Sequence, residues 1–527
     1  HGAANAGCGP LAVARRWPAA RPSRHSTRPP VVYEVHVDGC TRLAGGAAPG
    51  TFGALIEQLP RLATLGISVL ELLPVHQPDP QEGSYWGYMP LAFGAVDPRF
   101  AACADAAGEL AALVTAAHDH DIEVWLDVVF NHTTEAGASG PVYAYRGLAD
   151  ASYYRLRDDV SYVETTGCGN AIDATSPAAQ ELIVWALDRL ADLGVDGFRF
   201  DLAAVLSHSE AFIARLDRWA DGRGVRMVAE PWDAAGRYQL GGAWPGRGWM
   251  QWNDRFRDDV RSFLRGDVGC VPALPQRLQG SPDLFAAPMH SVNFLSCQTA
   301  SRCTTCSPTM SPTTTPTGTA GPTAPPTIDR GTAGGRGRTA RRPRSPPCAT
   351  VSCATRGPCW RWPTACRCAP EVTSSGAPRA ATTTPTIRTT RRRGSTGFGA
   401  SSSPTWRRFV AELLALRRRH PVLSQPEFWG DDVTWFGVDG QVGGGDDDDD
   451  PGARALAWTV GGLYVMANAW WEHLEFTIGT PGAWTRVVDT TRPPPGDIVA
   501  PVAGDLAGDR VGATHVVGPR SVVVLER

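Results

Sequence analysis

Two acidic side chains at the ends of apolar segments are the strongest candidates for chemistry in this sequence. Asp201 lies near the end of residues 194–204, GVDGFRFDLAA, and Glu230 lies near the end of residues 225–232, VRMVAEPW. Two carboxyl groups in different surroundings can share acid–base and nucleophilic work when one is ionised and the other is protonated near neutral pH. The sequence therefore offers a candidate pair of groups for such chemistry.

Arg199 indicates which of the two carboxyl groups is ionised. An unpaired charge inside an apolar strand is costly, and a neighbouring guanidinium favours the charged form of a carboxyl group. Asp201, two residues away, is therefore the candidate for the ionised group, and Glu230 is the candidate for the proton donor and acceptor. A structural ion pair at a strand end would explain Arg199 and Asp201 equally well, so other segments must decide.

Two further apolar segments also end in polar residues. Residues 122–132 read IEVWLDVVFNH, with Asp127 inside and Asn131 and His132 at the end, and residues 291–297 read SVNFLSC. Segments with helical periodicity lie between these stretches. Polar side chains at the carboxyl ends of successive parallel strands are typical of a (β/α) barrel active site.

Aromatic residues crowd the loop that follows a predicted buried strand at residues 67–74. Tyr85, Trp86 and Tyr88 stand close together in an otherwise polar stretch. Such rings can fill a core, and they can also stack on the apolar faces of sugar rings. These residues alone leave both roles open for Tyr88.

The motifs DVVFNH, GFRFD, AEPW and SVNFLSC, in this order, resemble the signature regions of the α-amylase superfamily of glycoside hydrolases. Trp232 after the Glu-Pro pair, TGCGN at residues 166–170 and YWGY at residues 85–88 resemble its isoamylase and glycogen-debranching branch. The resemblance covers residues 31–297 and resumes near Trp406. Four motifs in the expected order make it specific.

The resemblance implies a fold and a reaction. The expected fold class is α/β, a (β/α)8 TIM barrel damaged after its seventh strand, with a C-terminal all-β sandwich. The expected reaction is hydrolysis of α-1,6 branch linkages in glycogen or a related glucan, with retention of configuration. Asp201 would then carry a covalent glycosyl intermediate, and Glu230 would protonate the leaving oxygen and later activate water.

The resemblance also implies contacts with the substrate and excludes a cofactor. Tyr88 would stack on the reacting sugar and His132 would bond its hydroxymethyl group, and Asp127, Arg199 and Trp232 would complete the substrate-binding set. A mechanism with two carboxyl groups needs neither a cofactor nor a metal. We therefore expect a branched α-glucan as the partner.

Two other functions stay open at this point. An α-1,4-glucan hydrolase or a maltooligosyl trehalose hydrolase would use the same two carboxyl groups. A catalytically silent glucan-binding protein would keep Tyr88 and the C-terminal sandwich for binding. Retention on glycogen without release of reducing ends would favour the silent protein.

Length and charge narrow the class of protein. A chain of 527 residues exceeds one compact core, so a large barrel with a smaller domain is expected. The 50 basic and 53 acidic residues nearly balance, which argues against nucleic acid or acidic lipid as the main partner. The sequence shows neither a signal-peptide pattern nor an apolar run of membrane-spanning length, so we expect a cytoplasmic protein. Its oligomeric state stays open.

The sequence predicts a domain plan and several elements. We expect residues 1–30 to be a disordered or truncated remnant, so that the chain is incomplete at its front, and residues 31–297 to form the barrel. Residues 298–405 would be a frameshifted, disordered segment. Residues 406–425 would form the last barrel helix, and residues 426–527 would form the sandwich. Within the barrel, apolar spacing predicts a strand at residues 31–37 and helices at residues 54–65, 106–120, 180–193 and 249–265. The aspartates at residues 446–450 predict a solvated loop, with a weak cation site as the alternative.

The composition changes sharply at residues 298–405. This segment has no Leu, and eight of the 13 cysteines of the chain fall between residues 297 and 368. The family places a third carboxylate, in a His-Asp-Gly triplet, directly after residue 297, but this chain has Gln298, Thr299 and Ala300 there. Read literally, the segment is a Pro/Thr-rich linker, or it holds a metal at Cys303 and Cys306, for which a single CxxC is weak support.

A frameshift explains this segment better. If Gln298 is encoded by CAG, restoring one C nucleotide after CA changes the translation of residues 298–300 to His-Asp-Gly. In the same frame, residues 382–391 can be reread as NNNAYNQDNE and residues 394–397 as WFDW. Both resemble the sequence that the family has in this part of the chain. The lost stretch would also supply the eighth strand, so its absence would leave an unpaired sheet edge. We therefore expect the chain as written to have little or no activity.

We predict that resequencing the coding DNA will find an extra C at the codons for Cys297 and Gln298, and a compensating change shortly before Trp406. The restored frame would return the third carboxylate and close the barrel. Robust hydrolysis of glycogen or starch by protein confirmed by mass to be the chain as written would contradict the expected loss of activity.

Overall fold

The computed structural model describes residues 29–42, 48–79, 85–242, 248–297, 404–443, 452–500 and 508–527, together with Trp17, Gly46 and Trp244. Most of the predicted remnant at residues 1–30 lies outside these residues. So do residues 298–403, with Cys303, Cys306 and the positions of the reread motifs, and the aspartate run at residues 446–450. The predictions made for those stretches stay predictions.

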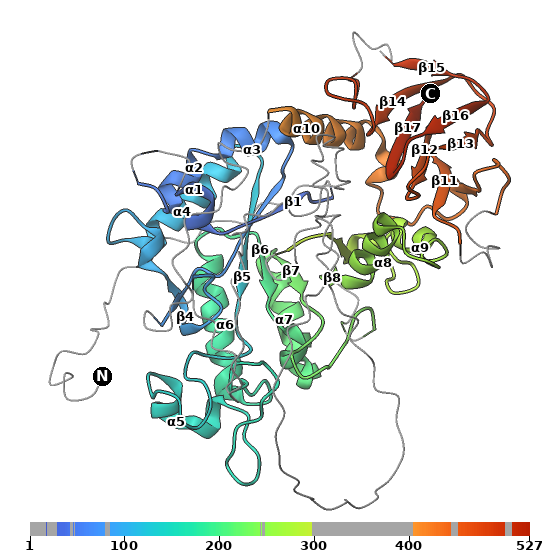
Figure 1. Cartoon of the computed structure of the whole chain (residues 1–527). Helices are drawn as coiled ribbons and strands as arrows, with labels where there is room; N and C mark the ends of the chain where they lie inside the picture. Colours follow the sequence, from blue (N-terminus) through green and yellow to red (C-terminus); the bar gives the residue numbers. More distant parts are fainter. Residues whose placement is uncertain are drawn as a thin grey trace, which may run out of the picture.

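A curled sheet of seven parallel strands forms the larger part of the molecule (Figure 1). Its strands, in spatial order, are β1 (Val32–Val35), β2 (Val69–Leu72), β5 (Glu123–Val128), β6 (Gly197–Phe200), β7 (Arg226–Ala229), β8 (Trp249–Asn253) and β9 (Ser291–Asn293). Among the described strands, β1 and β9 each pair with one neighbour, so the sheet is a half-barrel open between them. The predicted barrel-type α/β fold with seven strands is confirmed.

Alternation along the strands separates the two faces of this sheet. Phe198 and Phe200 of β6 point outward into a large apolar core shared with the helices, whereas Arg199 between them faces the inside of the curl. The inner face carries its own apolar layer, to which Trp125, Val228 and Trp252 contribute. Buried parallel strands need apolar residues on both faces, and both layers are present here.

Helices pack around the curled sheet. They are α1 (Val37–Thr41), α2 (Phe52–Ile56), α3 (Leu59–Leu65), α4 (Ala106–His118), α5 (Tyr145–Tyr153), α6 (Pro177–Ala191), α7 (Glu210–Arg223), α8 (Asp254–Arg265) and α9 (Leu274–Leu278). Helix α5 lies beside α6, away from the strands, and α8 and α9 lie on the side of the C-terminal strands (Figure 1). Short 3-10 helices lie at Pro98–Phe100, Ala203–His208, Pro288–His290, Pro421–Leu423 and Gly430–Asp432. The helix expected at residues 54–65 is divided into α2 and α3. Pro60 lies in the first turn of α3, where its missing N–H is tolerated, so it favours a new helix start.

The expected helix at residues 249–265 was wrong over its first five residues. Residues 249–253 form β8, and only the remainder is helical, as α8. All five residues of β8 are buried, which is typical of a central strand rather than of an amphipathic helix. Asn253 is the signal that sequence analysis missed, because its side chain caps α8 by accepting from the Phe256 N–H at 2.9 Å.

A hairpin rises from the carboxyl edge of the sheet. Its strands are β3 (His76–Pro78) and β4 (Pro90–Val96), and the aromatic loop at residues 85–88 lies between them. The hairpin therefore holds this loop beside the ends of the parallel strands.

The C-terminal part is all-β, as predicted. A six-stranded sheet has the order β10 (Val433–Phe436), β11 (Ala455–Val460), β12 (Leu463–Asn468), β17 (Ser521–Glu526), β14 (Trp484–Asp489) and β15 (Asp509–Val511). Strands β13 (Leu474–Thr477) and β16 (Thr514–Val517) pair separately and share one apolar core with a face of that sheet. The β13–β16 pair is thus the second layer of the sandwich, and the opposite face of the six-stranded sheet packs on α8 and on α10 (Pro404–Arg419).

Helix α10 belongs to both cores and lies between α3 and the C-terminal strands (Figure 1). Trp406 and Val410 pack against the barrel core, whereas Phe409 and Leu416 are buried in the core below the sandwich. Arg408 forms an ion pair with Asp497. The helix therefore fixes the two parts of the molecule to each other.

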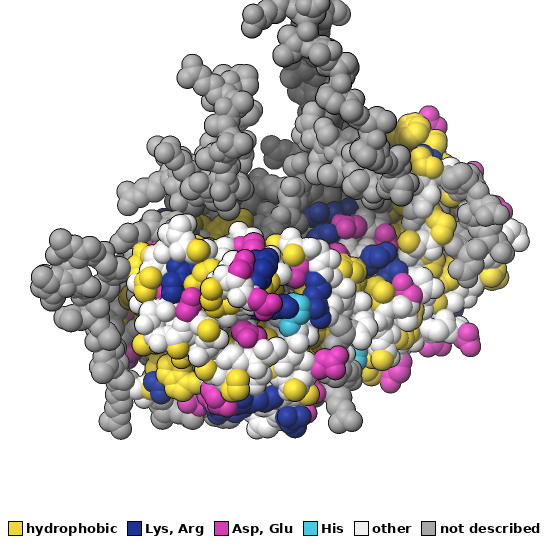
Figure 2. Space-filling model, turned by 90° about the horizontal axis from the view of Figure 1, so that it is seen from below, with side chains coloured by type: hydrophobic (Ala, Val, Ile, Leu, Met, Phe, Trp, Pro, Cys, Tyr) yellow, Lys and Arg dark blue, Asp and Glu magenta, His cyan; other side chains and the backbone are white. Residues whose placement is uncertain are grey.

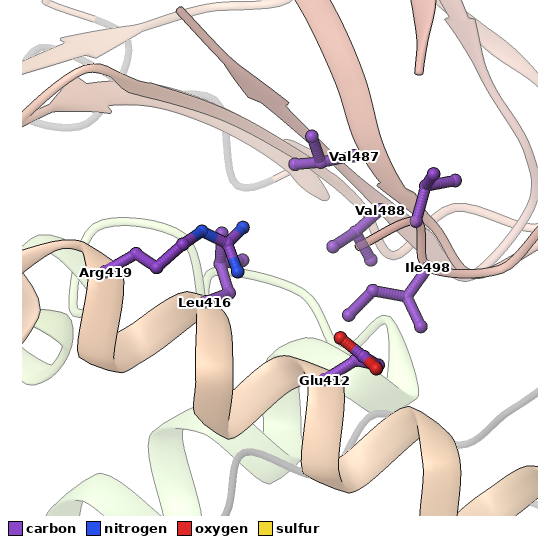
Figure 3. Close-up of a pocket in the computed structure, with 7 residues that line it drawn as sticks. Glu412, Leu416, Arg419, Val487, Val488 and Ile498 are labelled. Atoms are coloured by element: carbon purple, nitrogen blue, oxygen red, sulfur yellow. The ribbon is translucent and has the colours of Figure 1, made fainter. Parts of the chain in front are cut away.

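Figure 3 shows a shallow hollow along this contact, between α10 and β14. It is lined by Glu412, Leu416, Arg419, Val487, Val488, Ile498 and Val499. Aliphatic side chains of the two elements fill it too closely for a ligand. We therefore interpret it as a contact between packed elements. The polar side chains predicted to form the site lie elsewhere.

Surface charge agrees with the balanced composition. On the face that Figure 2 shows, acidic and basic side chains are interspersed in the coloured part. In the described part of the chain, no helix has both the length and the apolar character needed to cross a membrane.

We predict that Asn253→Ala destabilises the fold by about 2 kcal/mol or more, because Asn253 is fully buried and makes three contacts. Besides capping α8, its amide donates to Ser281 Oγ at 2.9 Å and Ser291 Oγ at 2.8 Å. Ser209→Ala is the matched control, since Ser209 only caps α7 through the Phe212 N–H. Urea unfolding measures both variants, and equal losses of unfolding free energy would contradict the prediction.

Candidate active site

A single buried guanidinium organises the polar cluster at the carboxyl edge of the sheet. Arg199 Nη1 donates to Asp127 Oδ1 at 2.9 Å and to Asp201 Oδ1 at 3.0 Å. Its other terminal nitrogen, Nη2, lies 3.1 Å from Glu230 Oε2. The structure therefore brings together four of the predicted site residues, and both candidate carboxyl groups of the reaction contact one cation.

Strand register explains this meeting. Asp127 of β5 pairs with Arg199 of β6, so their side chains lie side by side on the inner face. Asp201 and Glu230 are the first residues past β6 and β7, and their N–H groups still bond the neighbouring strand, to Val128 and Phe200 at 3.1 Å each. Continuing the sheet ladder by one residue fixes both backbones at the edge where parallel barrels place their sites.

The turn after Asp201 holds Glu230 in place. Leu202 adopts a left-handed conformation with φ of 40°, which a branched side chain rarely takes. This conformation directs its N–H to Glu230 Oε2 at 2.8 Å, and the next N–H, of Ala203, donates to the Glu230 carbonyl at 3.0 Å. Backbone strain at such a position is typical of functional sites, and here it orients the candidate acid.

Burial and charge act in opposite directions on the two inner carboxyl groups. Burial raises the pKa of Glu230 to about 7, although the Arg199 guanidinium opposes the rise. Burial likewise raises the pKa of Asp127 to about 7 against the same cation. One guanidinium cannot compensate the desolvation of every carboxyl group around it. Glu230 can therefore hold a proton near neutral pH, as a general acid must.

Asn131 and His132 tie the neighbouring loops to the nucleophile candidate. The Asn131 amide donates to the carbonyl oxygen of Asp201 at 2.7 Å and to its Oδ2 at 2.9 Å. His132 Nε2 donates to the Tyr88 carbonyl at 2.7 Å, and burial lowers the His132 pKa. The histidine is therefore close to the site, while Asn131 is a contact of Asp201 that the predicted residue set did not include.

Tyr88 joins the aromatic loop to the carboxyl cluster. Its hydroxyl donates to Asp127 Oδ2, and this bond fixes the ring beside the strand ends. Tyr85 and Trp86 are 38% and 37% exposed, so they form the rim rather than a core. Tyr85 also stacks on His36 with ring centres 4.2 Å apart. The loop thus presents several aromatic rings around one group of carboxylates.

Trp232 follows Glu230 on the segment past β7. It is half-buried, forms a β-bridge with Tyr238 and packs against the apolar layer inside the curl. Its position two residues after Glu230 keeps it near the carboxyl edge. Its predicted contact with substrate stays a prediction.

Three inward-facing residues were missed by sequence analysis. The Arg199 guanidinium lies 4.2 Å from the ring centre of Trp252, so an aromatic face backs the cation. Glu34 and Glu71 are paired across β1 and β2 and are 4% and 2% exposed. The sequence signal for Glu34 and Glu71 was a single acidic residue within an apolar strand pattern. Burying such a carboxyl group costs free energy unless it faces a polar interior.

The TGCGN loop buttresses the segment that carries Asn131. Gly169 has φ of 90°, and a Cβ there would approach the Gly137 nitrogen to 2.5 Å, so a larger residue does not fit. Asn170 accepts from the Thr133 N–H at 3.0 Å and donates to its carbonyl at 2.9 Å. Burial raises the pKa of the adjacent Cys168 thiol to about 12, which keeps it protonated.

The arrangement suits acid–base and nucleophilic chemistry by carboxyl groups. Within the described ranges, no group of three or more His, Cys, Asp or Glu side chains is arranged to hold a metal ion. One carboxyl group is held by a guanidinium and an amide, and burial raises the pKa of the other to about 7. Two carboxyl groups in different surroundings are what glycosidic hydrolysis uses.

Comparison with known families agrees with this geometry. A family profile described as the catalytic domain of alpha amylase matches residues 27–159, which include Tyr88, Asp127 and His132. A second profile, the C-terminal domain of isoamylase, matches residues 432–526. The two profiles cover the start of the curled sheet and the strands of the sandwich.

Similar proteins carry related names. A glycogen debranching enzyme of Dickeya chrysanthemi is 39% identical over 305 residues, which are 53% of this chain and 46% of the relative. Chloroplastic isoamylase 1 of Arabidopsis thaliana is 33% identical over 317 residues, 50% of this chain and 40% of the relative. The chain thus spans less than half the length of these relatives. A solved pullulanase from Bacillus acidopullulyticus superposes with a TM-score of 0.65 over 95% of this chain and 61% of its own, at 18% identity, and supports the fold alone.

We predict that Glu71→Gln makes the protein more stable at alkaline pH. Burial, with Glu34 nearby, raises the Glu71 pKa from 4.5 to about 8, and Arg199 only partly opposes this rise. The folded state then keeps a proton that the unfolded chain releases. The contribution of Glu71 to stability is therefore complete below pH 4.5 and is lost as the pH rises through about 8. A glutamine imitates the protonated form at every pH.

Thermal or urea unfolding between about pH 5 and about pH 9 measures this effect. The difference in unfolding free energy between Glu71→Gln and the unchanged chain should grow with pH by on the order of 1 kcal/mol per unit up to about pH 8. Glu181→Gln is the control, because its side chain is 69% exposed. A pH-independent difference for Glu71→Gln would show that Glu71 is ionised in the folded state.

Proposed function

We propose that this chain, in which an α-amylase catalytic domain precedes an isoamylase C-terminal domain, hydrolyses α-1,6 branch linkages in glycogen or a related glucan. The observation that carries the proposal is the contact of Asp201 and Glu230 with two nitrogens of one buried guanidinium. This contact holds two carboxyl groups with different tasks at one edge of the parallel sheet. The names of the matched relatives support the branch linkage.

The proposed reaction proceeds in two steps with retention of configuration. Glu230 first donates its proton to the glycosidic oxygen while an Asp201 oxygen attacks the anomeric carbon, so the leaving chain departs as an alcohol. Water then attacks the anomeric carbon of the glycosyl–Asp201 ester, Glu230 takes the proton of that water, and the carboxylate of Asp201 leaves. The site returns to its starting protonation after each cycle.

The surrounding residues have proposed roles in this reaction. Arg199 forms an ion pair with Asp201 and limits the rise in the pKa of Glu230. Tyr88 presents its ring to the reacting sugar, held by Asp127, and His132 and Trp232 bind sugar around it. No cofactor takes part. A cytoplasmic location belongs to the same proposal.

A silent glucan-binding protein is the second candidate. It is favoured by Gln298, Thr299 and Ala300, which stand where the family has the His-Asp-Gly of a third carboxylate. A charge-stabilising group that is missing from the transition state lowers the rate severely. The chain as written would then bind glucan at the same edge of the sheet and turn it over poorly.

We predict that a chain whose frame is restored after Cys297 releases reducing ends from glycogen, and that Asp201→Asn or Glu230→Gln in that chain lowers kcat by about a hundredfold or more. The control is Asp258→Asn, whose side chain is 60% exposed and lies outside the cluster. Reducing-end assays on glycogen and on a linear α-1,4 glucan separate the two linkages. Hydrolysis of the linear glucan alone would contradict the α-1,6 proposal.

The pH profile of the restored chain should fall on its alkaline side. Because Glu230 must be protonated to act as the acid and its pKa is about 7, kcat/KM should decline as the pH rises through about 7. Glu230→Gln should lack this decline at its lower rate. A rate that keeps rising to about pH 9 would exclude Glu230 as the acid.

A further inference from the structure

Two consecutive tryptophans form a stacked pair on the C-terminal part of the molecule. Trp470 and Trp471 follow β12 after one residue, Ala469, and their ring centres lie 3.9 Å apart with an angle of 20° between the planes. Trp471 is 55% exposed. With one face on Trp470 and more than half of its surface open, Trp471 presents a broad apolar surface to solvent.

The backbone around the pair is held at several points. The Trp470 N–H donates to Asn468 Oδ1 at 2.8 Å, and the Trp470 carbonyl accepts from the Arg520 N–H at 2.9 Å. Asn468 is 1% exposed, and its amide donates across the turn to the Glu472 carbonyl at 2.9 Å. The exposed indole therefore stands on a fixed turn, and a ligand that stacks on it would order little chain.

The same turn is joined to the barrel part. The Arg454 guanidinium lies 4.7 Å from the ring centre of Trp470, and its Nε donates to the Gly266 carbonyl at 2.7 Å, just past α8. Arg520 Nη1 donates to the Leu264 carbonyl at 3.1 Å. The tryptophan pair thus lies where the sandwich meets the end of a barrel helix, and its position relative to the barrel is set.

The size and surroundings of the open ring favour a sugar over a protein. Exposed polar residues, Glu472 and His473, follow Trp471 in the chain. A stable protein partner needs about 800 Å² on each side, with several apolar anchors. One indole face beside polar side chains instead matches a hexose ring, which has an apolar face and a rim of hydroxyl groups.

We propose that Trp471 is the platform of a second glucan-binding site, separate from the carboxyl cluster, on which one glucose ring of an uncharged α-glucan chain stacks. The identity of the sugar polymer rests on the proposed function, whereas the platform rests on the stacked, exposed and anchored indole. A polymeric substrate can occupy both places, and attachment at the second would raise the local concentration of branch points at the first.

Affinity electrophoresis of the full chain through gels that contain glycogen tests this site. Trp471→Ala should raise the apparent dissociation constant for glycogen by about three- to tenfold, the range expected for one lost stacking contact. Trp471→Phe should restore part of the affinity. Trp185→Ala is the matched control, because Trp185 on α6 is 52% exposed and should leave retention unchanged. Thermal unfolding confirms that the variants are folded.

Retention of Trp471→Ala equal to that of the unchanged chain would overturn the proposal. So would a change in self-association of Trp471→Ala, seen by sedimentation, without a change in glycogen retention, because the ring would then serve contacts between copies. Binding is measured without turnover, so loss of retention would support the site even if the chain hydrolyses nothing. Hydrolysis with unchanged retention would leave the proposed function intact and remove only this site.

Discussion

The sharing of one guanidinium among three carboxyl groups is the constraint on which the site depends. Arg199 is fully buried, and its contacts with Asp127, Asp201 and Glu230 compensate part of the desolvation of all four groups. Removing the cation would leave buried carboxyl groups that could persist only by taking up protons. The same cation thus makes the polar interior possible and opposes the rise in the pKa of Asp127 and Glu230.

The layers around the cluster make this concentration of charge possible. An apolar layer that includes Trp125 and Trp252 closes the inside of the curled sheet, and Trp252 lies against the guanidinium itself. Outside, the phenylalanines of β6 anchor the strand that carries Arg199 in the helical core. The charged groups are therefore held by rigid strands, and only their outer edge is available to a ligand.

Much of the fold could be predicted because parallel strands and their polar ends have clear patterns. Six of the seven strands of the curled sheet coincide with apolar runs in the sequence, and so do β10, β11, β12, β13 and β17 of the C-terminal part. Strand β8 was not recognised, since WMQWN continues into a charged helix and only Asn253 marks the change. The inner partners Trp252 and Glu71 could not be assigned either, because their meeting with Arg199 depends on register across strands that are distant in sequence.

Because α10 packs in both hydrophobic cores, it affects how the chain tolerates changes in length. The helix is embedded in the barrel core and in the core below the sandwich, and Cys297 is buried at the end of the seventh strand. A connection between two such fixed points is a closed loop, and the entropy of closing a loop grows only with the logarithm of its length, by about 0.6 kcal/mol per doubling. Closing the chain between Cys297 and α10 therefore costs little more free energy for a longer connection than for a shorter one.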